Sequence, residues 1–284
     1  MKNQIDKYLE HLKAAGRSGH TLRAYAHDLG KLSAFTDAQL EQITPPDVDR
    51  FLCDLRERGL STQSINRTTT AMKGFFAWLV ETDQLGQNPA RLVKLKGGKN
   101  KPPVFLSPEQ KAGLFKAIQD SRDNKASRDL AMFAFMGCVG LRVSEVASLN
   151  LEDLIEEKYI RVRTKGGKVE QKFLGKQMRK ILSAWLKERK RMETSSPALF
   201  PGQNEEHKRL SAEWIRIRLR HWCKKAGIPE ISPHKLRHTF ATELLGKSGN
   251  LGLVKRALGH VRIETTLVYA HVTDQQLRQA MEGM

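Results

Sequence analysis

The stretch from Asn88 to Leu106 constrains the fold of this 284-residue chain more than any other. Its Gly97-Gly98 and Pro102-Pro103 pairs rule out a continuous helix, and five Lys and Arg residues are interspersed among them. A chain of this length is also too long for one small core, so two domains are expected. We therefore predict an N-terminal domain over 1–87, a basic linker over 88–106 and a second domain over 107–284.

The N-terminal domain shows the helical period throughout. Apolar residues from Ile5 to Leu12 fall on one stripe, and a second stripe begins at about Thr21. A third helix is expected from Thr44, a good N-cap that a proline follows, and a fourth from about Ser61. These patterns predict an all-helical bundle.

The second domain combines helices with a small β element. Residues 130–149 read as a helix that is strongly apolar at its start. Two alternating runs follow, 159–164 and 169–174, and Gly166-Gly167 lies between them, which is a hairpin signal. The remaining segments are helical and end with a helix over about 274–281. The whole chain is therefore expected to be mainly α, with an α+β second domain.

The net charge of +18 points to a polyanionic partner. Residues 1–100 contain 15 Lys and Arg against 11 Asp and Glu, so the second part carries 14 of the surplus charges. No long apolar run suggests a membrane span, and no signal peptide is expected at the start. The three cysteines match no metal spacing and read as reduced thiols, so we expect a cytoplasmic protein.

The polar face of the fourth helix has two open interpretations. It carries Asn66, Arg67, Thr70 and Lys73 opposite the apolar stripe. Such a face is usually plain solvated surface, but in a basic protein it can equally lie in a groove of DNA. Lys99 and Lys101 of the linker suit a path alongside phosphates in the same way. These six residues are our candidate DNA contacts.

Four local patterns carry the candidate chemistry, and their order matters more than any one of them. Taken singly, each has an ordinary explanation, such as a helix ion pair between Arg142 and Glu145. Together they supply every part that phosphoryl transfer needs. They are Gly140-Leu-Arg-Val-Ser-Glu145, Lys165 at the hairpin turn, Ser232-Pro-His-Lys-Leu-Arg-His238, and Leu258-Gly-His260 followed by Tyr269.

The third pattern is the most informative. Ser232 is a natural N-cap, so His234 lies in the first turn, where backbone N–H groups and the helix dipole favour an anion. Arg237 is three residues further on and shares that face. A guanidinium beside an imidazole is a phosphate site with a proton-transfer group attached.

A metal site is the rival interpretation of the same helix. His234 and His238 have the i, i+4 spacing of the zinc-protease helix. However, Lys235 and Arg237 lie between them and would repel Zn²⁺, and no glutamate stands beside the first histidine. We therefore expect neither a metal nor any other cofactor.

In this order, the four patterns resemble the tyrosine recombinases of the phage integrase family, and the likeness looks closest to the Xer-type enzymes. The N-terminal segments 21–29 and 66–79 also resemble that family's SAM-like domain, which clamps DNA. The resemblance spans the chain, and the catalytic pattern is complete. It implies a helical core-binding bundle followed by a catalytic domain that ends in an exchange helix.

The resemblance also implies a role for each catalytic position. Tyr269 would be the covalent nucleophile, and it alone of the four tyrosines follows the histidine cluster. Arg142 and Arg237 would hold the scissile phosphate, and Glu145 would orient Arg142 or His234. The proton-transfer and hydrogen-bonding roles would fall to Lys165, which protonates the leaving 5′ oxygen, His234, which helps take the tyrosine proton, and His260, which donates to the phosphate.

The family further implies double-stranded DNA with a core recombination site as the partner. Four protomers would form the synaptic complex in the bacterial nucleoid, and the C-terminal helix near Leu277 would dock on a neighbour. Resolution of chromosome, plasmid or transposon multimers is the expected role, because no long N-terminal arm-binding extension is seen. Phage-type integration, a type IB topoisomerase and a DNA-binding regulator without catalysis remain alternatives.

Overall fold

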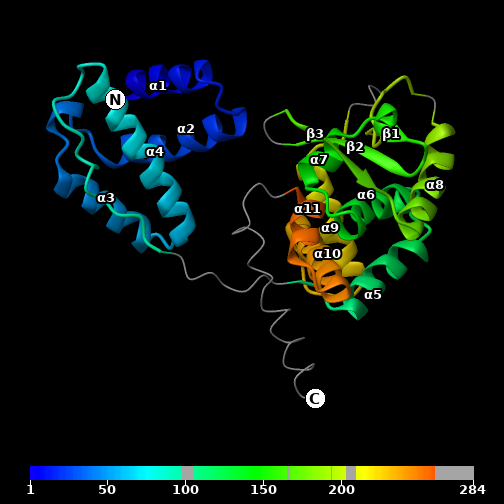
Figure 1. Ribbon diagram of the computed structural model, residues 1–284. Helices are drawn as coiled ribbons and strands as arrows, with labels where there is room; N and C mark the ends of the chain where they lie inside the picture. The colour runs from blue at the N-terminus through cyan, green and yellow to red at the C-terminus, as the bar shows by residue number, and fades with distance from the viewer. Residues whose placement is uncertain (98–104, 165–166, 193, 203–208, 260–284) are drawn as a thin grey trace. The chain divides into compact units, whose positions relative to one another are not determined.

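The computed structural model describes residues 1–97, 105–164, 167–192, 194–202 and 209–259. Backbone contacts divide the chain into two compact units, Met1–Asn100 and Lys101–Met284. Helices dominate both units, and a small antiparallel sheet occurs in the second (Figure 1). The predicted fold class is therefore confirmed. Among the described residues, no helix is both long and apolar enough to cross a bilayer.

The first unit is a helical bundle around an aromatic core. Ser18 and Ser61 cap their helices through side-chain oxygens that accept from the backbone N–H groups of Thr21 and Ser64. Phe51, Phe75 and Phe76 are among the fully buried side chains. The elements are α1 (Lys2–Ala14), α2 (Gly19–Phe35), η1 (Leu40–Gln42), α3 (Pro45–Glu57) and α4 (Thr62–Glu81).

The start of the expected linker is fastened to α4. The amide of Asn88 donates to the carbonyl of Lys73 at 3.1 Å, and Lys73 Nζ in turn donates to the carbonyl of Val93 at 3.0 Å. Asn66 makes a two-way pair with the backbone of Lys96, at 2.8 and 3.1 Å. Residues 88–97 therefore pack as part of the first unit. Lys99 and Lys101 lie outside the described residues.

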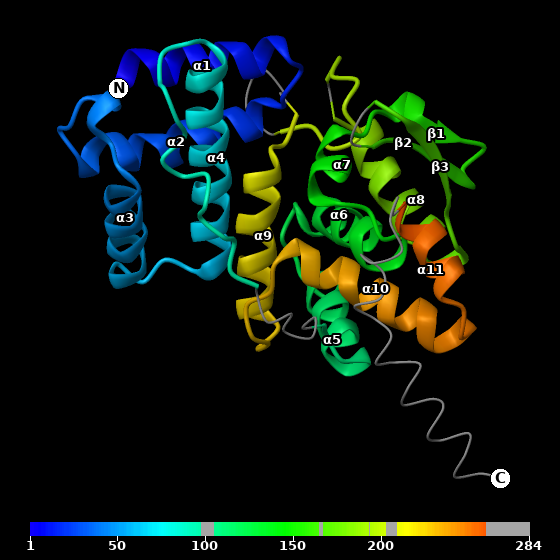
Figure 2. The same cartoon turned by 60° about the vertical axis from the view of Figure 1, so that its left-hand side comes forward.

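The second unit is built around α6, most of whose residues are buried. Helix α6 packs against α5, α8, α9 and α10, and α10 runs alongside it in Figure 2. This surrounding by helices explains the nearly continuous apolar sequence of α6. The helices are α5 (Pro108–Gln119), α6 (Ala126–Cys138), α7 (Val143–Ser148), α8 (Lys176–Lys190), α9 (Ala212–Lys225), α10 (Pro233–Ser248) and α11 (Leu251–Leu258), with the 3₁₀ turn η2 (Leu151–Asp153) after α7.

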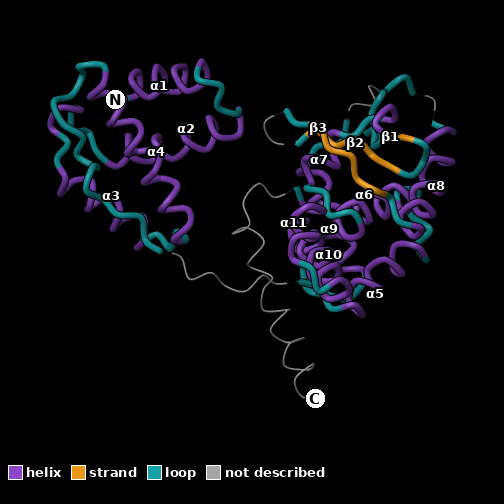
Figure 3. The backbone as a smooth tube through the Cα atoms, in the orientation of Figure 1, coloured by secondary structure: helices purple, strands orange, loops and turns teal. Residues whose placement is uncertain are grey.

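The sheet has the order β1-β2-β3 and lies beside α7 (Figure 3). Strands β2 (Tyr159–Arg163) and β3 (Val169–Phe173) form the predicted hairpin, and the short β1 (Leu154–Ile155) was not anticipated. Ile160 and Val162 of β2 face the core. Thr164 N donates to the carbonyl of Lys168 at 2.8 Å and closes the turn, whose residues 165 and 166 lie outside the described part.

Helices α10 and α11 form a small corner with its own apolar cluster of Ala241, Leu245, Val254 and Leu258. Gly249 and Gly259 end the two helices in the left-handed region, at φ of 61° and 66°. The helix expected over 274–281 lies outside the described residues.

Candidate active site

Gly140 creates the turn that presents the first arginine. Helix α6 ends at Cys138, and Gly140 takes a φ of +79°, which side-chain-bearing residues rarely adopt. A Cβ at this position would lie 2.5 Å from Cδ1 of Phe240 on α10. The backbone then extends through Arg142, which is the N-cap of α7. The glycine of the G-L-R pattern is therefore required by both conformation and space.

Glu145 links the two arginines of the predicted site. Its Oε2 accepts from the backbone N–H of Arg142 at 2.7 Å, and its Oε1 accepts from Arg142 Nη1 at 2.6 Å. Arg237 Nη1 lies 3.7 Å from Oε2 of the same carboxylate. The predicted ion pair at i, i+3 therefore exists, but the buried carboxylate is shared between two guanidinium groups. The carboxylate binds Arg142 and also faces Arg237.

Arg237 connects three segments that are far apart in the sequence. Its side chain is only 7% exposed, and it donates to the carbonyl of Gly140 and, at 2.7 Å, to the carbonyl of Leu258. It therefore ties α10 to the turn before Arg142 and to the end of α11. Buried charge of this kind is stable only when it is fully hydrogen-bonded.

His234 lies in the first turn of α10, as predicted, and the site favours its neutral form. Partial burial lowers the pKa of His234 below its ordinary value of 6.5. The positive charges of Arg237, Arg142 and Arg216 lower that pKa further. The imidazole is consequently neutral at pH 7 and can accept a proton. The described residues contain no group of three potential ligands that could hold a metal ion.

Lys165, His260 and Tyr269 lie outside the described residues, but the segments that lead to Lys165 and His260 are placed. The hairpin that carries residue 165 contacts the end of α11, which precedes residue 260. Lys172 Nζ of β3 donates to the carbonyl of Ala257 at 2.9 Å. Sequence reasoning missed Lys172, because its partner is 85 residues away and leaves no local pattern.

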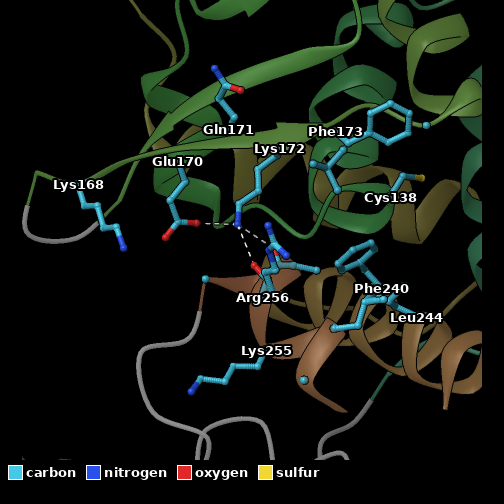
Figure 4. Close-up of a pocket in the computed structure, with 16 residues that line it drawn as sticks. Cys138, Lys168, Glu170, Gln171, Lys172, Phe173, Phe240, Leu244, Lys255 and Arg256 are labelled. Carbon is cyan, nitrogen blue, oxygen red and sulfur yellow. Dashed lines mark hydrogen bonds and ion pairs between the residues drawn. The ribbon is translucent and has the colours of Figure 1, made fainter. Parts of the chain in front are cut away.

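A cavity of about 830 Å³ opens between β3 and the α10–α11 corner (Figure 4). Lys168, Glu170 and Lys172 line one wall, and Phe240 and Leu244 of α10 line another. The end of α11 also lines the cavity, and Lys172 reaches from β3 to this end. The cavity therefore borders the place where the chain passes from Gly259 to residue 260.

The described tyrosines lack the surroundings of a nucleophile. Tyr8 is buried in the first unit, and burial raises its pKa to about 12. Tyr159 pairs edge-on with Phe173 at a centroid distance of 5.6 Å. Tyr25 lies on α2 in the first unit. None of the three belongs to the cluster around Arg142 and Arg237.

The candidate DNA contacts on α4 are engaged inside the first unit. Arg67 binds both carboxylate oxygens of Asp28, at 2.7 and 2.9 Å, and Asp28 is completely buried. Asn66 and Lys73 hold the chain that follows α4, and Thr70 donates to the carbonyl of Asn66 at 2.9 Å. The sequence suggested either solvated surface or a DNA face, and neither anticipated these internal bonds.

Comparison with family models places most of the chain. Residues 104–276 match the phage integrase family, and residues 5–83 match the N-terminal SAM-like domain of phage integrases. A tyrosine recombinase XerC of Chromobacterium violaceum is 33% identical over 286 residues, covering 100% of this chain and 94% of that protein. A tyrosine recombinase XerC of Pseudomonas aeruginosa is 34% identical, covering 98% and 92%.

Solved structures agree with these matches. The XerA recombinase is 26% identical, with a TM-score of 0.57, and the alignment covers 99% of this chain and 98% of that one. The XerH site-specific recombinase, in a post-cleavage complex with its palindromic difH substrate, has the same fold at a TM-score of 0.78. It is 24% identical, and the alignment covers 99% of this chain and 84% of that one.

Proposed function

Since this chain belongs to the phage integrase family and is a site-specific tyrosine recombinase, we propose that Tyr269 cuts DNA by attacking a backbone phosphate. The attack forms a 3′-phosphotyrosyl link and releases a 5′-hydroxyl, which then attacks the partner strand. The observation that carries the proposal is that Arg142 and Arg237 share the buried carboxylate of Glu145, close enough to His234 for their charges to lower its pKa. The alignments with the two XerC recombinases cover 94% and 92% of those proteins, which favours this function over a type IB topoisomerase.

The chemistry follows from the charges. A phenol has a pKa near 10, so holding Tyr269 as phenolate at pH 7 would cost roughly 4 kcal/mol. His234 therefore helps take the phenol proton as the Oη–phosphorus bond forms, and Lys165 protonates the 5′ oxygen as its bond to phosphorus breaks. One phosphodiester replaces another, so the bond energy is kept in the protein–DNA link. Neither ATP nor a metal ion is required.

Arg142 and Arg237 differ in exposure and therefore in how they act on the phosphate. Arg142 keeps 34% of its side chain exposed, so an incoming phosphate oxygen can reach its guanidinium. Arg237 is almost fully buried and holds the 140 turn and the α11 end in place. His260 adds a further donor to the phosphate. A donor that meets charge developing in the transition state typically contributes about 2.7–4 kcal/mol.

The partner in this proposal is duplex DNA that carries a core recombination site, with four protomers in the synaptic complex. The net charge of +18 supports a polyanionic partner. The α4 face and the segment 98–101 would add phosphate contacts, and Arg67 remains 46% exposed despite its bond to Asp28. The similarity to the XerC recombinases favours a role in the bacterial cytoplasm as a resolvase of chromosome, plasmid or transposon multimers.

Trapping the covalent intermediate tests the proposal. The core site is first recovered by binding selection from random duplexes and is then prepared with a nick, so that the cleaved strand diffuses away. The protein should form an adduct in EDTA that peptide mapping places at Tyr269. Tyr269→Phe should bind the site normally and form no adduct, whereas the control Tyr159→Phe should react. An adduct on another tyrosine would falsify the assignment.

A further inference from the structure

Helix α11 has few attachments for an element that leads into a catalytic segment. Only Val254 and Leu258 of this helix are buried. At its C-terminal end the N–H of Gly259 donates to the carbonyl of Arg256 at 3.2 Å, so the last two carbonyls, of Ala257 and Leu258, need partners from other elements. Arg237 provides one such partner, because its guanidinium donates to the carbonyl of Leu258. The position of this end of α11 therefore depends on what else holds it.

Lys172 supplies that second attachment. Its ammonium lies 2.9 Å from the carbonyl oxygen of Ala257 and 3.5 Å from that of Arg256, and it is 12% exposed. Figure 4 shows the side chain reaching from β3 to the end of the helix. A cation at a helix C-terminus also meets the negative end of the helix dipole. The strand and the helix are thereby joined by a charge-assisted contact.

Glu170 completes the contact. Its Oε2 lies 2.7 Å from Lys172 Nζ, and a Cβ on Gly259 would come within 2.8 Å of the same oxygen. The carboxylate therefore packs against Gly259, the residue that ends α11. The ion pair with Lys172 lowers the pKa of Glu170, and the more distant charge of Arg142 adds to this effect. Glu170 therefore contacts the end of α11 and also lies within the electrostatic reach of Arg142.

The placement of this pair is unusual for a strand. Lys172 lies opposite the buried Ile160, and Glu170 lies opposite the buried Val162. A hairpin that only needed stability would carry apolar residues at such positions, since partly buried charges lose hydration. Here the two charges are tolerated because they neutralise each other and cap the helix.

We propose that Glu170 and Lys172 are positioning residues that clamp the end of α11 to β3 and so fix the Leu258 carbonyl that Arg237 binds. This inference rests on the proposed function, because Arg237 is one of the two arginines proposed to act on the scissile phosphate. Neither Glu170 nor Lys172 touches the reacting atoms in this scheme. Their effect is exerted through the position of the α11 end, to which the Arg237 guanidinium is bound.

The test uses the full-length protein and three substitutions. Lys172→Met removes the ammonium but keeps an unbranched side chain, and Lys172→Arg restores a cation that can reach the carbonyls. Lys158→Met removes one exposed charge from the turn between β1 and β2, outside the contact with α11, and serves as the matched control. Each variant is measured for melting temperature, for affinity to the selected core site and for single-turnover cleavage of the nicked duplex at saturating protein.

Lys172→Met should slow cleavage by about 10-fold to 10²-fold, since small misplacements of reacting groups have effects of this size, while affinity stays unchanged. Lys172→Arg should recover most of the rate, and Lys158→Met should retain it. Without DNA, hydrogen exchange of the α11 amides should accelerate in Lys172→Met alone. Equal loss of melting temperature, affinity and rate would reduce the pair to a structural role and overturn the inference, as would an unchanged rate.

The exchange measurement separates this inference from the function on which it rests. It requires neither DNA nor a catalytic tyrosine. If Tyr269→Phe still forms an adduct, the proposed nucleophile is wrong, yet faster exchange in Lys172→Met would still establish the clamp. If Tyr269→Phe forms no adduct but exchange at α11 is unaltered in Lys172→Met, the nucleophile stands and the clamp is rejected.

Discussion

Each unit of the protein pairs an arginine with a buried carboxylate, and the two pairs differ in what surrounds them. In the first unit, Arg67 occupies both oxygens of Asp28, so the pair closes on itself. In the second unit, Glu145 is divided between Arg142 and Arg237. Burial lowers the pKa of His234, and the positive charges of Arg237 and Arg142 lower it further. An arginine in a closed pair stabilises a fold, whereas a shared carboxylate leaves charge available for a phosphate.

The largest expected difference between the two pairs is in catalysis. Lysine keeps the charge of arginine but loses the planar fork that grips two oxygens. Arg142→Lys and Arg237→Lys should each reduce single-turnover cleavage by about 10² or more, with little change in site affinity. Arg67→Lys should leave the rate intact. Unaltered cleavage in either of the first two variants would remove that arginine from the active site.

The two catalytic arginines should also differ from each other in stability. Arg237 donates to the carbonyls of Gly140 and Leu258 from a buried position, so Arg237→Lys should lower the melting temperature as well as the rate. Arg142 is partly exposed, so Arg142→Lys should leave the melting temperature nearly unchanged. Equal melting temperatures for the two variants would contradict this division of work.

The next prediction concerns the stability of the first unit. Arg67→Met strands the carboxylate of Asp28, whose nearest remaining cation is Lys31 at 3.8 Å. We expect a loss of roughly 1–3 kcal/mol in the free energy of unfolding, as for other buried polar groups that lose a partner. Urea denaturation measures it, and Arg67→Met with Asp28→Leu should recover part of the loss. A stable single variant would show that the pair is dispensable.

A further prediction concerns the acid limb of the pH profile of the cleavage rate. Because the pKa of His234 is lowered below 6.5, the imidazole is neutral at pH 7, and the rate should fall only as the pH drops through that lowered value. Arg216→Gln removes one of the charges that lower this pKa, so the limb should move to higher pH. The matched change Arg220→Gln should not move it. A limb that stays in place in Arg216→Gln would argue against His234 as the proton acceptor.

The smallest expected effect is on the salt dependence of binding. Each phosphate contact contributes about −0.9 to the slope of log affinity against log salt. Lys99→Gln and Lys101→Gln together should therefore flatten the slope by up to about 1.8. Lys73→Gln should change it less, because Lys73 Nζ is engaged by the carbonyl of Val93. A full-sized effect of Lys73→Gln would mean that this bond opens on DNA.

The sequence by itself determined the fold class, most of the helices and the β2–β3 hairpin. The single helix expected over 130–149 was wrong: it is two helices, α6 and α7, because Gly140 turns the chain between them. It also determined the order of the motifs and the placement of Ser232 and His234 at a helix start. These features are local, because periodicity, caps and turn residues act within a few positions of each other. The family resemblance rested on the same local patterns, and the whole-length relatives confirm it.

Only the tertiary structure decided which charged side chains pair, and whether a carboxylate pairs with one arginine or lies between two. Asp28 and Arg67 are 39 residues apart, and Lys172 is 85 residues from its carbonyl partner. The packing of residues 88–97 on α4 likewise depends on pairs such as Asn66 with Lys96. A polar residue on a helix or strand looks the same in sequence whether it faces water, DNA or a distant segment. Its partner is chosen when the elements pack, because burial makes an unpaired charge costly and so selects the arrangement that satisfies it.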